Sequence, residues 1–179
     1  MTSAMVQPFN QFSTLEDLGD LAPILRARPN ILALLKLFRS LPPDDVDIIA
    51  RYMHGYVALE DTVVFREGEI GDAMLFIVEG MVHVYRGDPV DGVTLGLLDR
   101  GKSFGEMALI ENMPRSATCV VLHECMFAAM TRANFEHLTA DHPRLAITVL
   151  KDVARMLSNR LRHANETREG GMFDFLDLQ

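Results

Sequence analysis

Cysteine is scarce in this sequence, and the histidines show no metal-binding spacing. Cys119 and Cys125 are the only cysteines, which is too few for an iron–sulfur cluster or a structural zinc site. The six histidines include no pair with a spacing such as HExxH. We therefore expect no metal ligands, and two reduced thiols that are mostly buried.

Basic residues are outnumbered by acidic ones, 17 to 25, and long apolar runs are lacking. The formal net charge of −8 argues against a protein that coats nucleic acid. No apolar run reaches the roughly 18 to 20 residues that a membrane-spanning helix needs. The first residues, MTSAMVQPFNQF, lack the charged start and apolar middle of a signal peptide. We expect a cytoplasmic protein that does not enter a membrane.

Catalytic signatures are missing as well. Gly68 and Gly71 could belong to a phosphate-binding loop, but no lysine follows them and no helix is expected there, so a Walker motif is excluded. Ser116 follows an arginine and has no obvious histidine partner that could activate it. We therefore expect a protein that is not an enzyme.

The segment from Ser103 to Thr118, SFGEMALIENMPRSAT, combines the features of an anion-binding site. Gly105 allows the backbone to approach a ligand closely, and the next residues have the composition of one short helical turn. The first amides of such a turn have no partner inside the helix and, with the helix dipole, suit an anion. If the loop from Glu111 to Pro114 folds back, the Arg115 guanidinium can reach the same anion.

Glu106 lies inside this segment and needs a separate explanation. A carboxylate is repelled by a phosphate, but it accepts hydrogen bonds from hydroxyl groups such as those of a ribose. A phosphate and a sugar hydroxyl recognised together indicate a nucleotide.

Residues 104–119, FGEMALIENMPRSATC, resemble the phosphate-binding cassette of cyclic-nucleotide-binding domains. The family pattern is Phe-Gly-Glu, two apolar residues, a short loop, and arginine followed by two small residues. The matching positions are Phe104, Gly105, Glu106, Met107, Ala108, Arg115, Ser116 and Ala117. Upstream, FREGEIGDAMLFIVEGMVHVY is similar to the glycine-punctuated strands of that family, and the resemblance covers roughly Phe38 to Asn165.

The resemblance implies a regulatory ligand, cyclic AMP or cyclic GMP, with cyclic AMP favoured. Arg115 would pair with the cyclic phosphate, together with the Met107 and Ala108 amides and the Ser116 hydroxyl. Glu106 would accept a bond from the ribose 2′-hydroxyl.

The resemblance also implies contacts with the base. Leu98 would pack on the purine, and Asn159, Arg160 and Leu161 of a long helix are the nearest candidates to cover it. Related regulators often have small hydroxyl residues at these lid positions, and this sequence does not. Ser116 leaves the base open, because a hydroxyl after the arginine favours guanine in some relatives, yet serine also occurs in cyclic-AMP binders.

The predicted fold class is α+β, an antiparallel β-roll or jelly roll flanked by N-terminal helices and a long C-terminal helix. We expect a helix from Ser13 or Thr14 with an apolar face and a second over 31–38. A third should start within 41–45, with Pro42 or Pro43 in its first turn, and run through Tyr52. The apolar face of the first would consist of Leu15, Leu18, Leu21, Ile24 and Leu25.

A period of two begins after Gly55 and predicts many short strands, with no helix between them as a doubly wound fold would need. The expected strands are 56–59, 62–66, 73–79, 81–86, 94–98, 116–121 and 125–130. Gly80 would form a tight reversal between two of them, and the two cysteines would lie on neighbouring strands.

A short helix is expected from Thr131 to Leu138, and a long one from about Asp141. The long helix carries an apolar seam with a period near 3.5, formed by Leu150, Val153, Leu157 and Ala164, with Leu161 beside it. This face packs on the roll or forms a parallel helix pair, and we favour a homodimer through 143–166, as in regulators of the catabolite activator type.

The predicted organisation has an N-terminal extension over 1–30, partly helical, and a cyclic-nucleotide-binding domain over 31–141. A lid or dimerisation helix over 142–169 and a flexible tail over 170–179 follow. Too few residues remain after this helix for a helix-turn-helix, so no direct DNA binding is expected. We expect a stand-alone sensor that signals to a protein partner. The alternatives are a transcriptional-regulator-like protein without its own DNA-reading domain, and an interaction module without a ligand.

Overall fold

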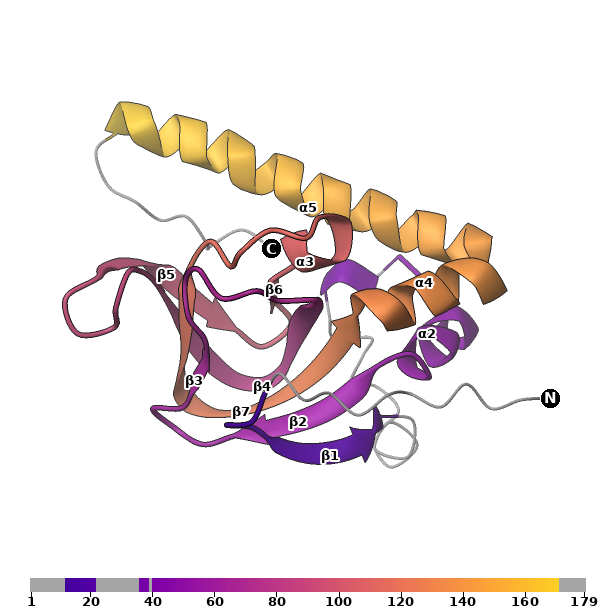
Figure 1. The fold of residues 1–179 in the computed structure, drawn as a ribbon. Helices are drawn as coiled ribbons and strands as arrows, with labels where there is room; N and C mark the ends of the chain where they lie inside the picture. Colours follow the sequence, from indigo (N-terminus) through magenta and orange to yellow (C-terminus); the bar gives the residue numbers. More distant parts are fainter. Residues whose placement is uncertain (1–11, 22–35, 39, 171–179) are drawn as a thin grey trace.

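The computed structural model of this protein describes residues 12–21, 36–38 and 40–170. Its body is an antiparallel seven-stranded sheet that curls into a roll (Figure 1). The strand order is β1-β2-β7-β4-β5, with β3 paired to β7 and β6 paired to β4. The strands are β1 (Glu16–Asp20), β2 (His54–Ala58), β3 (Val63–Phe65), β4 (Ala73–Arg86), β5 (Val93–Asp99), β6 (Ser103–Phe104) and β7 (Thr118–Thr131).

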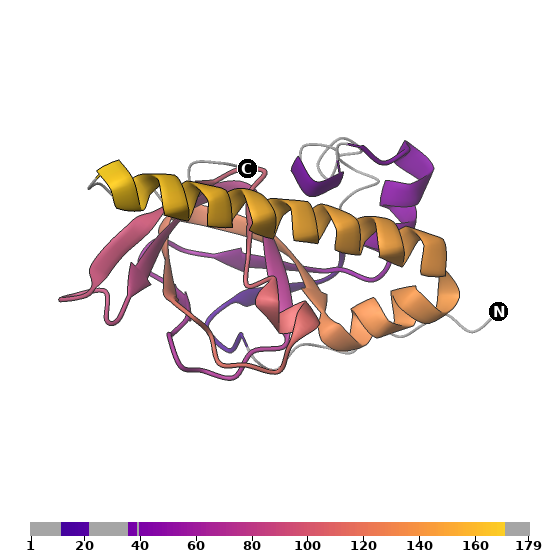
Figure 2. The same ribbon diagram turned by 90° about the horizontal axis from the view of Figure 1, so that it is seen from above.

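The helices gather on one side of the roll. They are η2 (Lys36–Phe38), α2 (Pro43–Ala50), α3 (Met107–Ile110), α4 (Arg132–Asp141) and α5 (Pro143–Gly170). The long helix α5 runs lengthwise across the roll, above α3 and β6 (Figures 1 and 2). In the described residues, no helix is both long and apolar enough to cross a bilayer. The α+β roll with a long C-terminal helix is therefore confirmed.

The two longest strands, β4 and β7, are each 14 residues long and pair with one another along most of their length. The predicted reversal at Gly80 is wrong: Gly80 lies within β4 with a positive φ of 95°, and the β4–β7 register shifts between Ile77 and Val82. These irregularities bend the strand without ending its pairing. The predicted break between 121 and 125 is wrong for the same reason, so Cys119 and Cys125 lie on one strand, both buried and unpaired.

The N-terminal segment differs most from its prediction. Glu16–Asp20 forms strand β1 against β2, with Glu16 opposite Val57 and Asp20 opposite His54. Pairing with β2 satisfies the backbone N–H and C=O groups of β1. These hydrogen bonds to another strand outweigh the helical spacing of the leucines. The predicted helix positions Ile24 and Leu25 lie outside the described residues. So does the predicted helix over 31–38, except for 36–38, which forms a 3₁₀ turn.

Two later helices begin where the sequence predicts. Pro43 begins α2, and Asp44 and Asp45 lie in its first turn, where carboxylates interact favourably with the positive end of the helix dipole. Thr131 caps α4, and its side chain accepts a hydrogen bond of 2.8 Å from the Asn134 amide.

Helix α5 has two apolar stripes rather than the single predicted seam. Val153 is only 1% exposed and packs into the core with Val149 and Met156, so it is not available to a partner. The exposed stripe consists of Ile147, Leu150, Ala154 and Leu161, with Leu157 half-buried among them. The side chain of Ala164 lies outside the described residues.

Candidate functional site

A cavity of about 380 Å³ lies between the roll and α5. Its volume falls in the range of small-molecule sites, roughly 300–1,000 Å³. Every site residue in the sequence-based prediction lines it: Leu98, Phe104, Gly105, Glu106, Met107, Ala108, Arg115, Ser116, Ala117 and Arg160. Of the two other lid candidates, Leu161 lines the cavity, whereas Asn159 does not and instead accepts a bond from Arg162.

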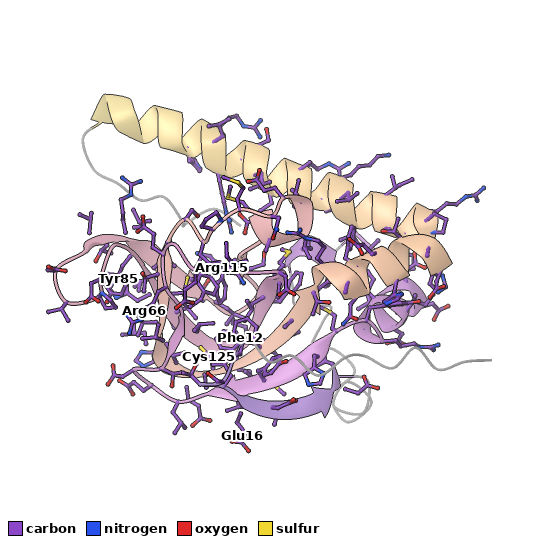
Figure 3. All side chains as sticks on the ribbon, in the orientation of Figure 1. Phe12, Glu16, Arg66, Tyr85, Arg115 and Cys125 are labelled. Carbon is purple, nitrogen blue, oxygen red and sulfur yellow. The ribbon has the colours of Figure 1, made fainter. Side chains whose placement is uncertain are left out.

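Arg115 is the buried cation of this cavity and lies below α3 and α5 in Figure 3. Its Nη1 donates to the Ala73 carbonyl (2.8 Å) and, at 3.3 Å, to the Gly105 carbonyl, and its Cζ lies 4.1 Å from the centre of the Phe65 ring. Its Nε has no hydrogen-bond partner among the described residues. Burial lowers the pKa of this guanidinium, whereas nearby acids, including Asp72 and Glu106, oppose that shift. The group is thus held in place with a donor that is still available to an anion.

The backbone around Arg115 explains how the guanidinium fits. Arg115 N–H donates to the Glu69 carbonyl (2.8 Å), and the Arg115 carbonyl accepts from Gly68 (2.9 Å). Gly105 has a φ of +73°, and a Cβ there would lie 2.5 Å from Arg115 Nη1. A Cβ at Gly71 would overlap the guanidinium itself. Both glycines are therefore required by the close approach of Arg115, and Gly105 also by its positive φ.

Glu106 is the buried acid of the cavity, only 5% exposed. Its Oε1 accepts a bond of 2.5 Å from Arg160 Nη1 of α5, and Arg160 Nη2 donates to the Ser103 carbonyl at 2.6 Å. Glu106 Oε2 has no hydrogen-bond partner in the described part of the chain. The carboxylate is therefore charge-paired on one oxygen and keeps the other as an acceptor. Arg160, one of the predicted lid residues, is bonded to this acid.

The turn α3 differs from its expectation in one detail. The Ala108 and Leu109 amides donate to the Gly105 carbonyl (3.1 Å) and the Glu106 carbonyl (3.0 Å). The Ala108 amide would have to exchange this partner in order to bind an anion, so only the amides before it are uncommitted within the described residues.

Arg132 holds the other end of α3, and the sequence contained no signal for it. Its Nε and Nη2 donate to the Ala108 carbonyl at 2.9 and 2.7 Å, and Nη2 also donates to the Glu111 carbonyl at 2.6 Å. These carbonyls belong to the end of a helical turn and lack partners within it. Since Arg132 begins α4, it links the position of α3 to the helices that follow.

The remaining walls of the cavity are mostly apolar. The lining residues that were not predicted are Phe65, Val84, Arg86, Leu95, Met113, Pro114, Cys119 and Leu157. Burial raises the pKa of the Cys119 thiol, so this group is neutral and acts as an apolar wall. The alternation of β4 could have identified Val84 and Arg86, which share one face of that strand.

The cavity thus offers one buried guanidinium, one buried carboxylate and a mostly apolar wall. This set suits a ligand with an anionic group, a hydroxyl and a flat apolar part. The structure shows no cluster of three or more histidine, cysteine or acidic side chains that could hold a metal in the ranges it describes.

Comparison with known proteins agrees with this chemistry. The family model described as "Cyclic nucleotide-binding domain" matches residues 58–142. A cyclic nucleotide-gated potassium channel of Rhizobium etli is 36% identical over 122 residues, which is 68% of this chain and 33% of the channel. The cyclic AMP receptor protein of Thermus thermophilus is 30% identical over 131 residues, 72% of this chain and 58% of the relative. The chain therefore spans between about a third and somewhat more than half of these two relatives.

The fold also matches a solved structure along nearly its whole length. A cyclic nucleotide-binding domain from Methylobacillus flagellatus superposes with a TM-score of 0.77, covers 96% of each chain and is 29% identical in sequence. The resemblance stated from residues 104–119 is thereby confirmed.

Proposed function

Because residues 58–142 belong to the cyclic nucleotide-binding domain family, we propose that this protein senses a 3′,5′-cyclic nucleotide, changes conformation on binding and signals to a protein partner. The main support is that Arg115 and Glu106 share one cavity, and each keeps a buried polar atom without a partner among the described residues. Cyclic AMP is the first candidate, because the Thermus relative is named a cyclic AMP receptor protein. The activity is binding rather than catalysis.

The cyclic phosphate pairs with Arg115. The guanidinium is held by the Ala73 and Gly105 carbonyls, so little side-chain entropy remains to be lost when the anion binds. A charge-assisted bond from Nε is among the stronger hydrogen bonds available to a protein. The Ser116 hydroxyl lines the same cavity and adds a donor.

The ribose 2′-hydroxyl donates to Glu106. This hydroxyl is free in a 3′,5′-cyclic nucleotide but not in a 2′,3′-cyclic one, so the carboxylate distinguishes these two cyclic isomers and favours ribose over 2′-deoxyribose. Leu98, buried on β5, packs on the purine together with Val84 and Leu95.

The signal passes through α5. The Glu106–Arg160 bond joins residues 54 apart in sequence and ties α5 to the cassette. A ligand hydroxyl that arrives at Glu106 changes the partners of this carboxylate, and therefore the strength with which it holds Arg160. The ligand shifts the population of α5 positions in proportion to its differential affinity for them.

The exposed stripe of α5 supports a homodimer. Ile147, Leu150, Ala154, Leu157 and Leu161 follow one another at spacings of three, four, three and four residues. This repeat is that of a two-helix coiled coil. Since Leu157 and Leu161 also line the cavity, the dimer surface and the ligand lid share residues.

Isothermal titration calorimetry on the full chain tests the proposal. We expect saturable binding of cyclic AMP or cyclic GMP, weaker binding of the 2′-deoxy analogue, and no comparable binding of 5′-AMP, which lacks the cyclic phosphate. If no cyclic nucleotide binds or raises the melting temperature, the proposal is wrong and a ligand-free interaction module takes its place.

A further inference from the structure

An arginine occupies an inward-facing position at the end of β4. Val82 and Val84 are buried on one face of this strand, and Arg86 is the next residue on that face. Tyr85 lies between them on the opposite face, where its hydroxyl contacts His83 Nδ1 at 2.6 Å. Arg86 accordingly lines the cavity, although its side chain is exposed at the rim.

The acids near Arg86 in sequence and space are already committed. Glu67 Oε2 accepts a bond of 2.6 Å from the Gly87 amide, and Asp88 pairs with Arg66 at 3.6 Å. In the part of the chain that the structure describes, the Arg86 side chain has no hydrogen bond and no ion pair. Its donors are therefore available to a molecule in the cavity.

Arg86 lies away from the guanidinium of Arg115. The Arg115 side chain points to the carbonyl of Ala73 at the start of β4, whereas Arg86 ends that strand. The same cavity is lined by Val84, which shares a face of β4 with Arg86, and by Leu95 and Ala117, and these side chains suit the flat face of a base rather than a phosphate.

Guanine and adenine differ at the base edge that carries N7 and the substituent at position 6, to which a guanidinium can donate hydrogen bonds. Guanine presents two acceptors, O6 and N7, and arginine can bond to both at once. Adenine presents N7 as an acceptor and N6 as a donor, and a guanidinium has donors only. One of the two bonds is therefore lost with adenine, and an N–H group faces another N–H group.

We propose that Arg86 is a base-selecting residue that favours guanine, so that cyclic GMP, the alternative to the first candidate cyclic AMP, is a ligand of this cavity. The inference rests on the proposed function, because it presumes that a cyclic nucleotide binds here. It adds the contact that chooses among the bases.

Titration calorimetry of the full chain with cyclic GMP, cyclic AMP and cyclic IMP tests this assignment. Cyclic IMP keeps O6 and N7 but lacks the 2-amino group, so it isolates the edge that Arg86 reads. We expect Arg86→Leu to lower the affinity for cyclic GMP and cyclic IMP about tenfold, and to change the affinity for cyclic AMP less than about twofold. Arg86→Gln should shift the preference toward cyclic AMP, because glutamine pairs with adenine N6 and N7. Arg66→Leu removes an equal charge outside the cavity, so it should leave the ratio of cyclic GMP affinity to cyclic AMP affinity unchanged.

The possible failures are distinguishable. If the Arg86 variants weaken all three nucleotides equally, Arg86 acts only as a positive charge and the assignment is wrong. If the Arg86 variants leave the ratio of cyclic GMP affinity to cyclic AMP affinity unchanged, the assignment is also wrong. If the unmodified protein binds none of the three, the proposed function itself fails.

Discussion

Gly71 and Arg115 occupy adjoining space: a methyl group at residue 71 would overlap the Arg115 guanidinium. Gly71 has no positive φ, so alanine is compatible with its backbone. We expect Gly71→Ala to displace the guanidinium and weaken cyclic nucleotide binding about tenfold, which corresponds to the loss of one charge-assisted bond. Calorimetry on Gly71→Ala, Arg115→Ala and the double variant forms a mutant cycle. If the Gly71 substitution still weakens binding in the Arg115→Ala background, its effect does not pass through Arg115.

Arg115→Ala removes the only guanidinium that is buried inside the cassette in the described structure. The anionic group then lacks its charge-assisted partner, and we expect a loss of about 2 to 4 kcal/mol of binding free energy. Arg115→Lys should recover part of this, because an ammonium keeps the charge but not the planar fork. Binding of cyclic AMP or cyclic GMP as tight as in the parent would contradict the assignment.

Arg160→Leu leaves the buried carboxylate of Glu106 without its cation. We expect the free energy of unfolding in urea to fall by about 1.5 to 3 kcal/mol, the range for a hydrogen bond to a charged group. Adding Glu106→Gln should restore part of the stability, since the unpaired charge is removed. The same Glu106→Gln variant should discriminate less between cyclic AMP and its 2′-deoxy analogue. Stability that is unchanged by Arg160→Leu would show that this pair does not tie α5 to the cassette.

Arg132→Leu tests the link between α3 and α4. The Ala108 and Glu111 carbonyls lose their shared donor, so we expect α3 to be less well positioned and ligand affinity to fall about tenfold. Arg132→Lys should have a ligand affinity between those of the parent and Arg132→Leu, because one ammonium binds the two carbonyls less well than a guanidinium does. Arg144→Leu, an exposed residue on α5, is the control. If Arg132→Leu lowers the melting temperature without changing affinity, Arg132 is only structural.

The α5 dimer is tested at positions that do not line the cavity. Ile147 and Leu150 are exposed, and a charge at the centre of a coiled coil is costly. We expect Ile147→Asp and Leu150→Asp to convert the dimer into a monomer in sedimentation equilibrium, with little change in circular dichroism. Lys151→Asp, on the neighbouring exposed position, should leave the dimer intact. A monomeric parent protein at every concentration measured would rule out the dimer.

Local sequence sufficed for the cassette because its parts are close together in the chain. Phe104 to Ala117 form one continuous segment, and the glycine, the short turn and the returning arginine each have a local cause. The same holds for the first turn of α2, with its proline and two acids, and for the Thr131 cap of α4, which are visible in the residues themselves.

Segments whose structure depends on distant partners were predicted less well. Leucine spacing in 15–21 fits a helix, but the edge of β2 turns Glu16–Asp20 into a strand. Gly80 is typical of a reversal, yet pairing with β7 continues across it. In both cases hydrogen bonding to a strand far away in sequence outweighs a local preference.

The sequence by itself determined the roll, the cassette and the two charged groups of the cavity, since those follow from periodicity and from a short ordered motif. Only the tertiary structure decided that Glu106 pairs with Arg160, that Arg132 holds α3 and that Arg86 faces the cavity. It also showed that α5 buries Val153 and exposes Ile147 and Leu150 instead. The reason is physical: a charge or an apolar face acquires its partner from packing between elements, and no residue within one element specifies that partner.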